Sequence, residues 1–216
     1  MIQLYYAPST ASLIPHLLLR EMGIPFELVL VDRAVKAQKS PEFIALNPNG
    51  LVPVLKDGEL VIYETAAICL YLCDTYCHDG LVPAIGTAER ASFYKWLIWL
   101  TNTMQSTLMA YFNPGRWVAE GNEEGAAQVK TRAQEKVYGM LDQLDAELQS
   151  HGGEWFMGNT FTALDIYVFI MCRWTRGFSS RPAREYPHLA PYLQRMLARP
   201  ATQSAFATEK LSEPFV

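Results

Sequence analysis

Three of the four cysteines are spaced to share one face of a helix and could present a cluster of sulfur ligands. Cys69, Cys73 and Cys77 lie four residues apart, His78 follows directly, and Cys172 is distant in the sequence. Zinc takes sulfur and imidazole ligands, but no Cys-x-x-Cys pair is present, and ligands on a single helix do not converge easily on a tetrahedral ion. The spacing favours small residues on a packed helix face, and we expect no bound metal.

A second pattern with chemical potential stands at the start of an expected helix. Glu64 and Thr65 follow an apolar run and precede a segment of alanine and isoleucine. The first N–H groups of a helix lack partners within it and its N-terminal dipole end is positive, so this position can hold a carboxylate. The same two residues also fit a simple N-cap with acidic help.

The composition limits the classes of protein that can carry these patterns. Of 216 residues, 50% are hydrophobic and 19% are charged, which excludes an intrinsically disordered chain. The net charge is −4 and no basic run occurs, so nucleic acid is not an expected partner. No apolar run reaches the roughly 20 residues that span a bilayer, and the N-terminus lacks signal-peptide features. We expect a cytoplasmic protein without a membrane segment.

The first part of the chain alternates between strand and helix patterns. Residues 2–6 form a strand pattern, Ser12 can cap a helix over 13–22 that ends at Gly23, and 26–31 form a second strand. A single helix between two strands predicts a parallel pair.

A weak helix, a hairpin and a further helix follow. The weak helix lies around 41–44, the hairpin pairs 52–56 with 59–63 around Asp57-Gly58, and the helix runs from about 64 to 77. The order β-α-β-α-β-β-α predicts an α/β domain over residues 1–78.

The second part of the chain loses this alternation. A linker over 79–87 precedes an all-helical domain expected over 88–216. The expected helices run over about 88–112 with Thr87 as cap, over 123–150, from 161–165 onward, and from 186 to a stop at Arg199-Pro200.

Three local motifs and this order of elements together resemble the cytosolic glutathione transferase superfamily over the whole chain. The motifs are Asn49–Leu55, which contains Val52-Pro53, then Tyr63–Ile68, and Phe161–Tyr167 with a capping box of Thr162 and Asp165. The resemblance implies a thioredoxin-like N-terminal domain with a cis proline at Pro53, and an all-α C-terminal domain. It also implies glutathione as co-substrate, with no permanently bound cofactor.

The resemblance assigns roles in glutathione binding. Val52, ahead of Pro53, would offer one N–H and one C=O to the extended peptide. Thr65 would bind the γ-glutamyl carboxylate, and Glu64 would face the γ-glutamyl ammonium. The glycine carboxylate needs a donor from the stretch after the second strand, where Lys36 and Gln38 are available and Lys39 is an alternative, although surface lysines are usually only solvated. The electrophile is expected against the first long helix, at Asn102, Gln105 and Met109.

Activation of the glutathione thiol needs a donor at the end of the first strand. A free thiol has a pKa near 8.5, and a hydroxyl donor beside a helix N-terminus lowers it. The candidates, in the order we expect, are Ser9 and Thr10 level, then Ser12, then Tyr6. For Ser12 and Tyr6 the structural alternatives are a helix cap and a packed strand residue.

This loop resembles most closely the bacterial beta class of the superfamily. Ala11 stands where that class carries a cysteine, and Gln105 aligns with its histidine. Both departures argue against a cysteine-centred, mixed-disulfide chemistry.

The resemblance implies transfer of glutathione to a hydrophobic small molecule, a detoxification chemistry, in a homodimer. The alternatives are a glutathione-dependent disulfide or peroxide reductase and a non-catalytic binding protein with the same fold, because fold alone does not fix function. Glu64-Thr65 and Val52-Pro53 favour glutathione binding in each enzymatic case.

Overall fold

The computed structural model describes residues 1–76 and 80–216, which divide by their contacts into two compact units. The first unit is Met1–Leu81 with Met196–Glu213, and the second is Val82–Arg195 with Pro214–Val216. The expected domains, 1–78 and 88–216, meet this division only in part, because a C-terminal segment returns to the first unit. The expected boundary at 78 and 79, like Cys77 and His78, lies outside the described residues.

The first unit contains a four-stranded sheet with strand order β2-β1-β3-β4. Its strands are β1 (Ile2–Tyr6), β2 (Phe26–Leu30), β3 (Val54–Asp57) and β4 (Leu60–Tyr63). β1 and β2 are parallel, and β3 pairs antiparallel with both β1 and β4. The predicted parallel pair and the hairpin at Asp57-Gly58 are confirmed, and Gly58 has the positive φ that a tight hairpin turn requires.

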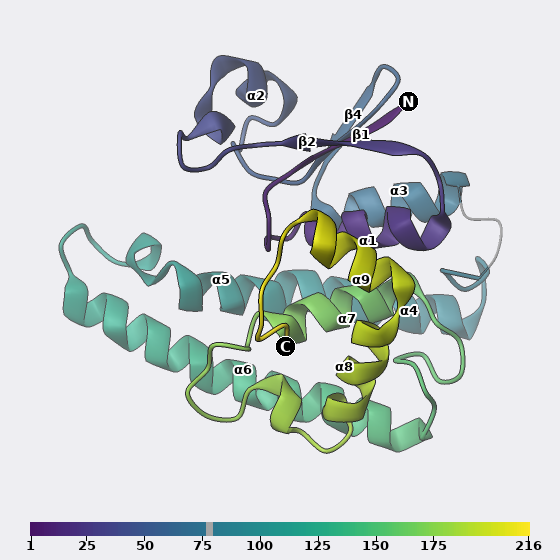
Figure 1. Ribbon diagram of the computed structural model, residues 1–216. Coiled ribbons are helices and arrows are strands. Elements are labelled where there is room, and N and C mark those ends of the chain that lie inside the picture. The colour runs from purple at the N-terminus through teal and green to yellow at the C-terminus, as the bar shows by residue number, and fades with distance from the viewer. Residues whose placement is uncertain (77–79) are drawn as a thin grey trace. The chain divides into compact units, whose positions relative to one another are not determined.

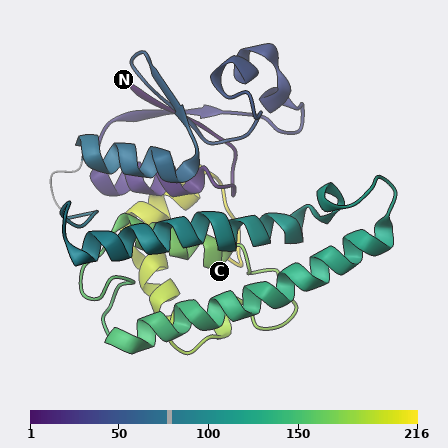
Figure 2. The same ribbon diagram turned by 180° about the vertical axis from the view of Figure 1, so that it is seen from behind.

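Helices complete the first unit (Figure 1). They are α1 (Leu13–Met22), the short η1 (Ala37–Lys39), α2 (Pro41–Leu46), α3 (Thr65–Tyr76) and α9 (Pro200–Thr208). Figures 1 and 2 show α1 and α3 side by side on one face of the sheet. α1 is buried along most of its length and ends at Gly23 in the left-handed conformation, as predicted.

The predicted stop of the fourth helix at Arg199-Pro200 is confirmed, but a further helix that was not predicted follows it. α8 (Leu189–Ala198) ends there, but Pro200 opens α9, because the first helical position does not need an N–H. α9 packs against α1, and Arg199 holds Glu21 with two hydrogen bonds of 2.6 and 2.7 Å. These contacts bring the C-terminal segment into the first unit.

The second unit is helical. It contains α4 (Ala88–Trp99), η2 (Leu100–Gln105), α5 (Ser106–Phe112), η3 (Pro114–Trp117), α6 (Glu123–His151), α7 (Ala163–Arg173), η4 (Ala183–Glu185) and most of α8. The helix predicted over 88–112 has the expected extent, but η2 in its middle is π-helical, a geometry that is often associated with functional sites. α5 and α6 run side by side (Figures 1 and 2).

The caps that start two of these helices were predicted correctly. Thr87 accepts from the Arg90 N–H at 3.1 Å, and the capping box of Thr162 and Asp165 is present at the start of α7. α7 is buried along its whole length. Among the described residues, no helix is both long and apolar enough to cross a membrane.

Candidate functional site

One edge of the candidate site lies where β3 begins. The Val52-Pro53 peptide is cis, as expected, with Pro53 buried and Val52 half-buried. The pairs of the β1–β3 and β3–β4 ladders begin at Val54 on this strand, so Val52 stands outside the sheet. The side chain of Val52 packs on a small core of Val31, Phe43 and Val54.

The start of α3 supplies the next part of this edge. Glu64 is exposed and has φ +75°, and its carbonyl accepts the Ile68 N–H at 2.9 Å. Thr65 is the first helical residue and is buried to 7% exposure. The left-handed turn at Glu64 thus ends β4 and begins α3, leaving the first N–H groups of α3 to hold an anion.

The loop between β1 and α1 is closed by its own hydroxyls. Ser12 is fully buried; its Oγ accepts the Ala7 N–H at 3.2 Å and lies 3.0 Å from the Ala7 carbonyl oxygen. Thr10 Oγ1 lies 2.8 Å from the same carbonyl oxygen and 2.9 Å from Ser12 Oγ. Ser12 occupies the N-cap position of α1 but makes no capping bond, because its hydroxyl turns back to Ala7.

Ser9, in the same loop, has a left-handed backbone with φ +61°. Its N–H donates to the Glu209 carboxylate at 2.9 Å, which ties the loop to the residue that follows α9. Ser9 and Thr10 are half-buried, whereas Ala11 is buried and carries no functional group.

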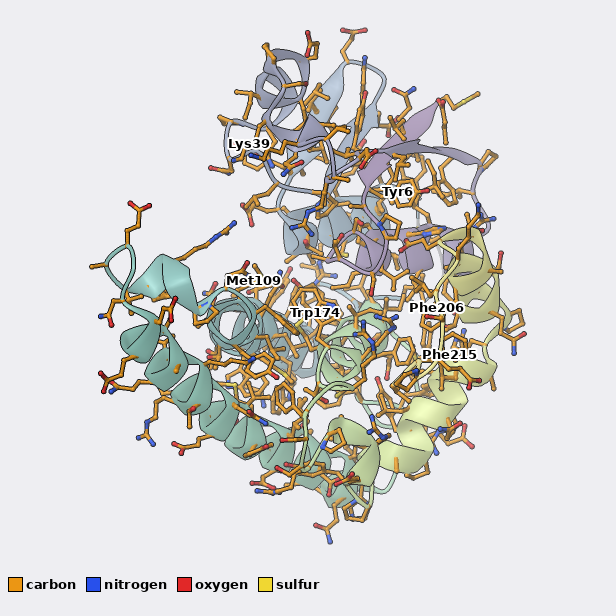
Figure 3. The ribbon with its side chains drawn as sticks, turned by 60° about the vertical axis from the view of Figure 1, so that its left-hand side comes forward. Tyr6, Lys39, Met109, Trp174, Phe206 and Phe215 are labelled. Carbon is orange, nitrogen blue, oxygen red and sulfur yellow. The ribbon has the colours of Figure 1, made fainter. Side chains whose placement is uncertain are left out.

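Tyr6 lies at the end of β1, beside this loop (Figure 3). Burial, and to a lesser degree the negative charge of Glu209, raise the pKa of the Tyr6 hydroxyl. A phenol with a raised pKa stays protonated but is a weaker acid, and therefore a weaker donor to a thiolate than an ordinary tyrosine.

The candidate cations lie after β2. Lys36 is exposed with φ +58°, and Gln38 is half-buried with its Oε1 lacking a hydrogen-bond partner among the described residues. The Lys39 ammonium lies over Gly50, only 2.7 Å from where a Cβ on that glycine would be (Figure 3). Lys39, the alternative donor, and the backbone carbonyl of Gln38 therefore both lie close to Gly50, two residues before Val52.

The predicted electrophile residues belong to the second unit. Asn102 is exposed on η2, and Met109 is half-buried on α5 (Figure 3). Gln105 Oε1 accepts the Tyr167 hydroxyl at 2.6 Å, so this side chain is held by α7.

Aromatic rings gather near the end of α5 in the same unit. Phe112 packs edge-on against Trp174 with ring centroids 6.0 Å apart, and Tyr111 contacts Phe178 at 4.6 Å. Phe112 is 48% exposed. Trp174 and Phe178 come from a distant segment of the sequence, so the prediction of an electrophile site on the first long helix did not include them.

The cysteines form no metal site among the described residues. Cys69, Cys73 and Cys172 are buried. Burial raises the pKa of Cys69 well above its ordinary value, with a smaller effect from Cys73, and burial also raises the pKa of Cys172. Where the structure describes the chain, no three metal-ligating side chains gather.

Comparisons with known proteins identify the family. The glutathione S-transferase N-terminal domain model matches residues 8–75, and the C-terminal domain model matches 72–200. Glutathione S-transferase GST-4.5 of Xanthomonas campestris is 32% identical over 98% of this chain and 100% of its own length. Glutathione S-transferase GstA of Escherichia coli O157:H7 is 30% identical over 97% and 100%.

Solved structures agree with this assignment. A sphingomonad glutathione S-transferase complexed with glutathione has a TM-score of 0.81 and 33% identity, covering 97% of this chain and 100% of its own. A Sulfitobacter glutathione transferase homologue with bound glutathione has a TM-score of 0.88 and 26% identity, covering 98% and 99%. With both domain models matched in order along one chain, the protein belongs to the glutathione S-transferase family.

Proposed function

We propose that the protein binds glutathione on its first unit, activates the glutathione thiol, and transfers glutathione to a hydrophobic electrophile. The observation that carries this proposal is the start of α3, where Glu64 turns the chain and Thr65 stands at a helix N-terminus. Two similar structures have glutathione bound, which supports the same co-substrate here.

Glutathione would lie along the edge formed by β3 and α3. Its γ-glutamyl carboxylate would accept from Thr65, its ammonium would face Glu64, and its backbone would pair with Val52. A helix start favours an anion by roughly 0.3–1 kcal/mol when exposed. For the glycine carboxylate, Lys36 and Gln38 remain candidates, and the position of Lys39 over Gly50 favours Lys39.

The thiol would be activated by Ser9 or Thr10. Ser12 is fully buried and braces Ala7, which argues against it as the donor. The Thr10 hydroxyl can turn from the Ala7 carbonyl and donate to the thiolate, because Ser12 can satisfy that carbonyl alone. The Thr10 oxygen still accepts from the Ser12 N–H at 3.4 Å. The positive end of the α1 dipole adds to the stabilisation of the thiolate.

The electrophile would contact the second unit. Asn102, Gln105 and Met109 are the proposed polar and apolar contacts. The neighbouring rings of Phe112 and Trp174 suit a flat apolar molecule, since aromatic pairs bind through offset and edge contacts.

We also propose a cytoplasmic homodimer. Each unit exposes apolar side chains on secondary structure: Leu60 and Val61 on β4, and Tyr94 and Ile98 on α4. Burial of such surface drives self-association, and closed two-fold symmetry is its commonest form. Sedimentation at micromolar concentration tests this proposal, and a 24.4 kDa species would contradict it.

Calorimetric titration with glutathione, followed by a chromogenic aryl-halide assay, tests the main proposal. Binding together with turnover is the expected result, and absence of glutathione binding would overturn it. Binding without turnover would favour a non-catalytic carrier. Incubation with oxidised glutathione tests the reductase alternative, and mass spectrometry should find no adduct in the loop of Ala11, which has no thiol.

A further inference from the structure

Glu209 places a buried carboxylate against the β1–α1 loop. Its Oε2 accepts the Ser9 N–H at 2.9 Å, and its Oε1 lies 2.8 Å from His16 Nδ1. Both the Glu209 and His16 side chains are fully buried. Glu209 directly follows α9, and Lys210 after it is left-handed, so the chain turns away at this point.

The proton on His16 can be placed from its second partner. Arg20 Nε donates to His16 Nε2 at 3.4 Å, and an arginine can only donate. His16 Nε2 is therefore the acceptor, and Nδ1–H donates to Glu209. With Nε2 facing Arg20, the pair of His16 and Glu209 cannot act as a base for the loop hydroxyls, so the pair has a different role.

Three locally unfavourable features coincide here. A carboxylate at a helix C-terminus opposes the helix dipole, and a buried carboxylate is costly unless it is well hydrogen-bonded. A non-glycine residue in the left-handed region, such as Ser9, has a strained backbone. The bond from Ser9 to Glu209 couples these features, since the charge-assisted hydrogen bond stabilises both groups.

We propose that Glu209 is a positioning residue for thiol activation: by holding the Ser9 peptide, it sets the direction of the Ser9 and Thr10 hydroxyls. This inference rests on the proposed function, because it assigns a role in the activation of bound glutathione. Glu209 acts through the loop and contacts none of the reacting atoms. Glutathione affinity, which we assign to Glu64, Thr65 and Val52, should be independent of it.

Glu209→Gln is the informative variant. It keeps the size of the side chain, but an amide has one acceptor oxygen and one donor nitrogen. If the oxygen faces Ser9, the NH₂ group meets the His16 Nδ1–H; if it faces His16, the NH₂ group meets the Ser9 N–H. A switched His16 tautomer does not relieve this conflict, because its Nε2–H would then meet the Arg20 Nε–H.

Glu21→Ala is the matched control. Glu21 and Arg199 join α1 to α9 through a separate ion pair, which does not involve the loop. The control therefore weakens the same packing of two helices while leaving the Ser9 N–H bonded to Glu209.

The experiment first measures glutathione binding and turnover of the wild type. Absence of both would overturn the proposed function itself. Given an active wild type, Glu209→Gln should lower kcat about 10- to 100-fold, the effect of a small misplacement of a catalytic group. The KM for glutathione should change less than about 3-fold. Hydrogen exchange of the loop amides should accelerate in Glu209→Gln and not in Glu21→Ala.

A double-mutant cycle separates positioning from general loss of structure. In a chain with both Ser9→Ala and Thr10→Ala, Glu209→Gln should lower kcat less than about 2-fold further. Glu209→Asp keeps the charge with a shorter reach and should retain part of the turnover, which provides a second variant if Glu209→Gln does not fold. Unchanged kcat in an active, folded Glu209→Gln protein, or the full loss in the chain lacking both hydroxyls, would overturn the inference.

Discussion

The start of α3 and the β1–α1 loop are held in place by different means. At α3, the left-handed Glu64 closes a bond from its carbonyl to the Ile68 N–H, so neighbouring residues fix the geometry. In the loop, the left-handed Ser9 is bonded to Glu209, 200 residues away in the sequence. Both regions belong to the first unit and both present polar groups.

This difference separates binding from activation. A helix start that is built locally keeps its N–H groups in place whenever α3 forms. A loop that depends on a remote carboxylate can lose its geometry while the helix start stays intact. We therefore expect substitutions at the helix start to change glutathione affinity and substitutions in the loop to change turnover.

The largest expected effect comes from the loop hydroxyls. Replacing the true donor, Ser9 or Thr10, by alanine should lower kcat about 10- to 1000-fold, the range for loss of a preorganised donor. The other variant should lose much less, and calorimetry should give an unchanged glutathione affinity for both. Steady-state kinetics of the two single variants would contradict the separation if neither kcat changes.

Substitution of Gly50 tests whether the close packing around this residue helps to hold the glutathione-binding edge in place. A Cβ there would lie 2.8 Å from the Gln38 carbonyl oxygen, and φ is +61°. Gly58 has a similar φ, +58°, but nothing lies within 4 Å of its added Cβ. Gly58→Ala should cost about 1–2 kcal/mol for the backbone conformation, and Gly50→Ala should cost a further 1–3 kcal/mol or so for overpacking.

Urea unfolding of the two glycine variants measures this difference. Glutathione affinity should fall in Gly50→Ala alone, because Lys39 must also move from its place over Gly50. Equal destabilisation of the two variants would show that the close contact at Gly50 is relieved without strain.

Thr65→Ala should weaken glutathione binding by about 1–3 kcal/mol, the scale of a lost hydrogen bond to a charged group. Thr65→Ser keeps the hydroxyl and serves as the control. Turnover at saturating glutathione should stay close to that of the wild type in both variants. Calorimetry that finds equal affinity for Thr65→Ala and Thr65→Ser would remove the hydroxyl from the binding site.

The smallest expected effect concerns the ionisation of Tyr6. Burial and then Glu209 raise its pKa, so the folded state favours the neutral phenol. This contribution to stability is fully present below the unfolded pKa of about 10 and is lost as the pH rises through the higher folded value. Glu209→Gln should lower the Tyr6 pKa only in part, since burial is the larger cause.

Tyrosine-labelled NMR across alkaline pH would follow this titration. Tyr6→Phe identifies the signal and should remove its contribution to the pH dependence of stability. A Tyr6 pKa that is identical with and without the Glu209 charge would place the carboxylate too far away to affect the loop electrostatically.

The features that the sequence predicted are those with local causes. Asp57-Gly58 between two apolar runs predicted the hairpin, and Thr162 with Asp165 predicted a capping box three residues wide. Each pattern lies within a few residues of the structure that it produces. Family resemblance added the cis bond before Pro53, which the structure confirms.

The features that were missed depend on distant partners. Ser12 fits a helix cap by type and position, but its buried hydroxyl is satisfied by Ala7 instead. Pro200 was interpreted only as the residue that ends a helix, but it is also the first residue of α9, which packs against α1. Glu209 follows α9 in an ordinary polar stretch, and no local signal relates it to Ser9.

The bond from Glu209 to Ser9 also has a consequence for biosynthesis. Chains are made from the N-terminus at about 5–20 residues per second, and domains tend to fold as they emerge. The sheet strands and α3 are complete long before the carboxylate that holds Ser9 has been translated, with 200 residues between the two partners. With α3 complete at Tyr76, the nascent chain can therefore form its glutathione-binding edge about 7–27 s before Glu209 is available to hold the activating loop.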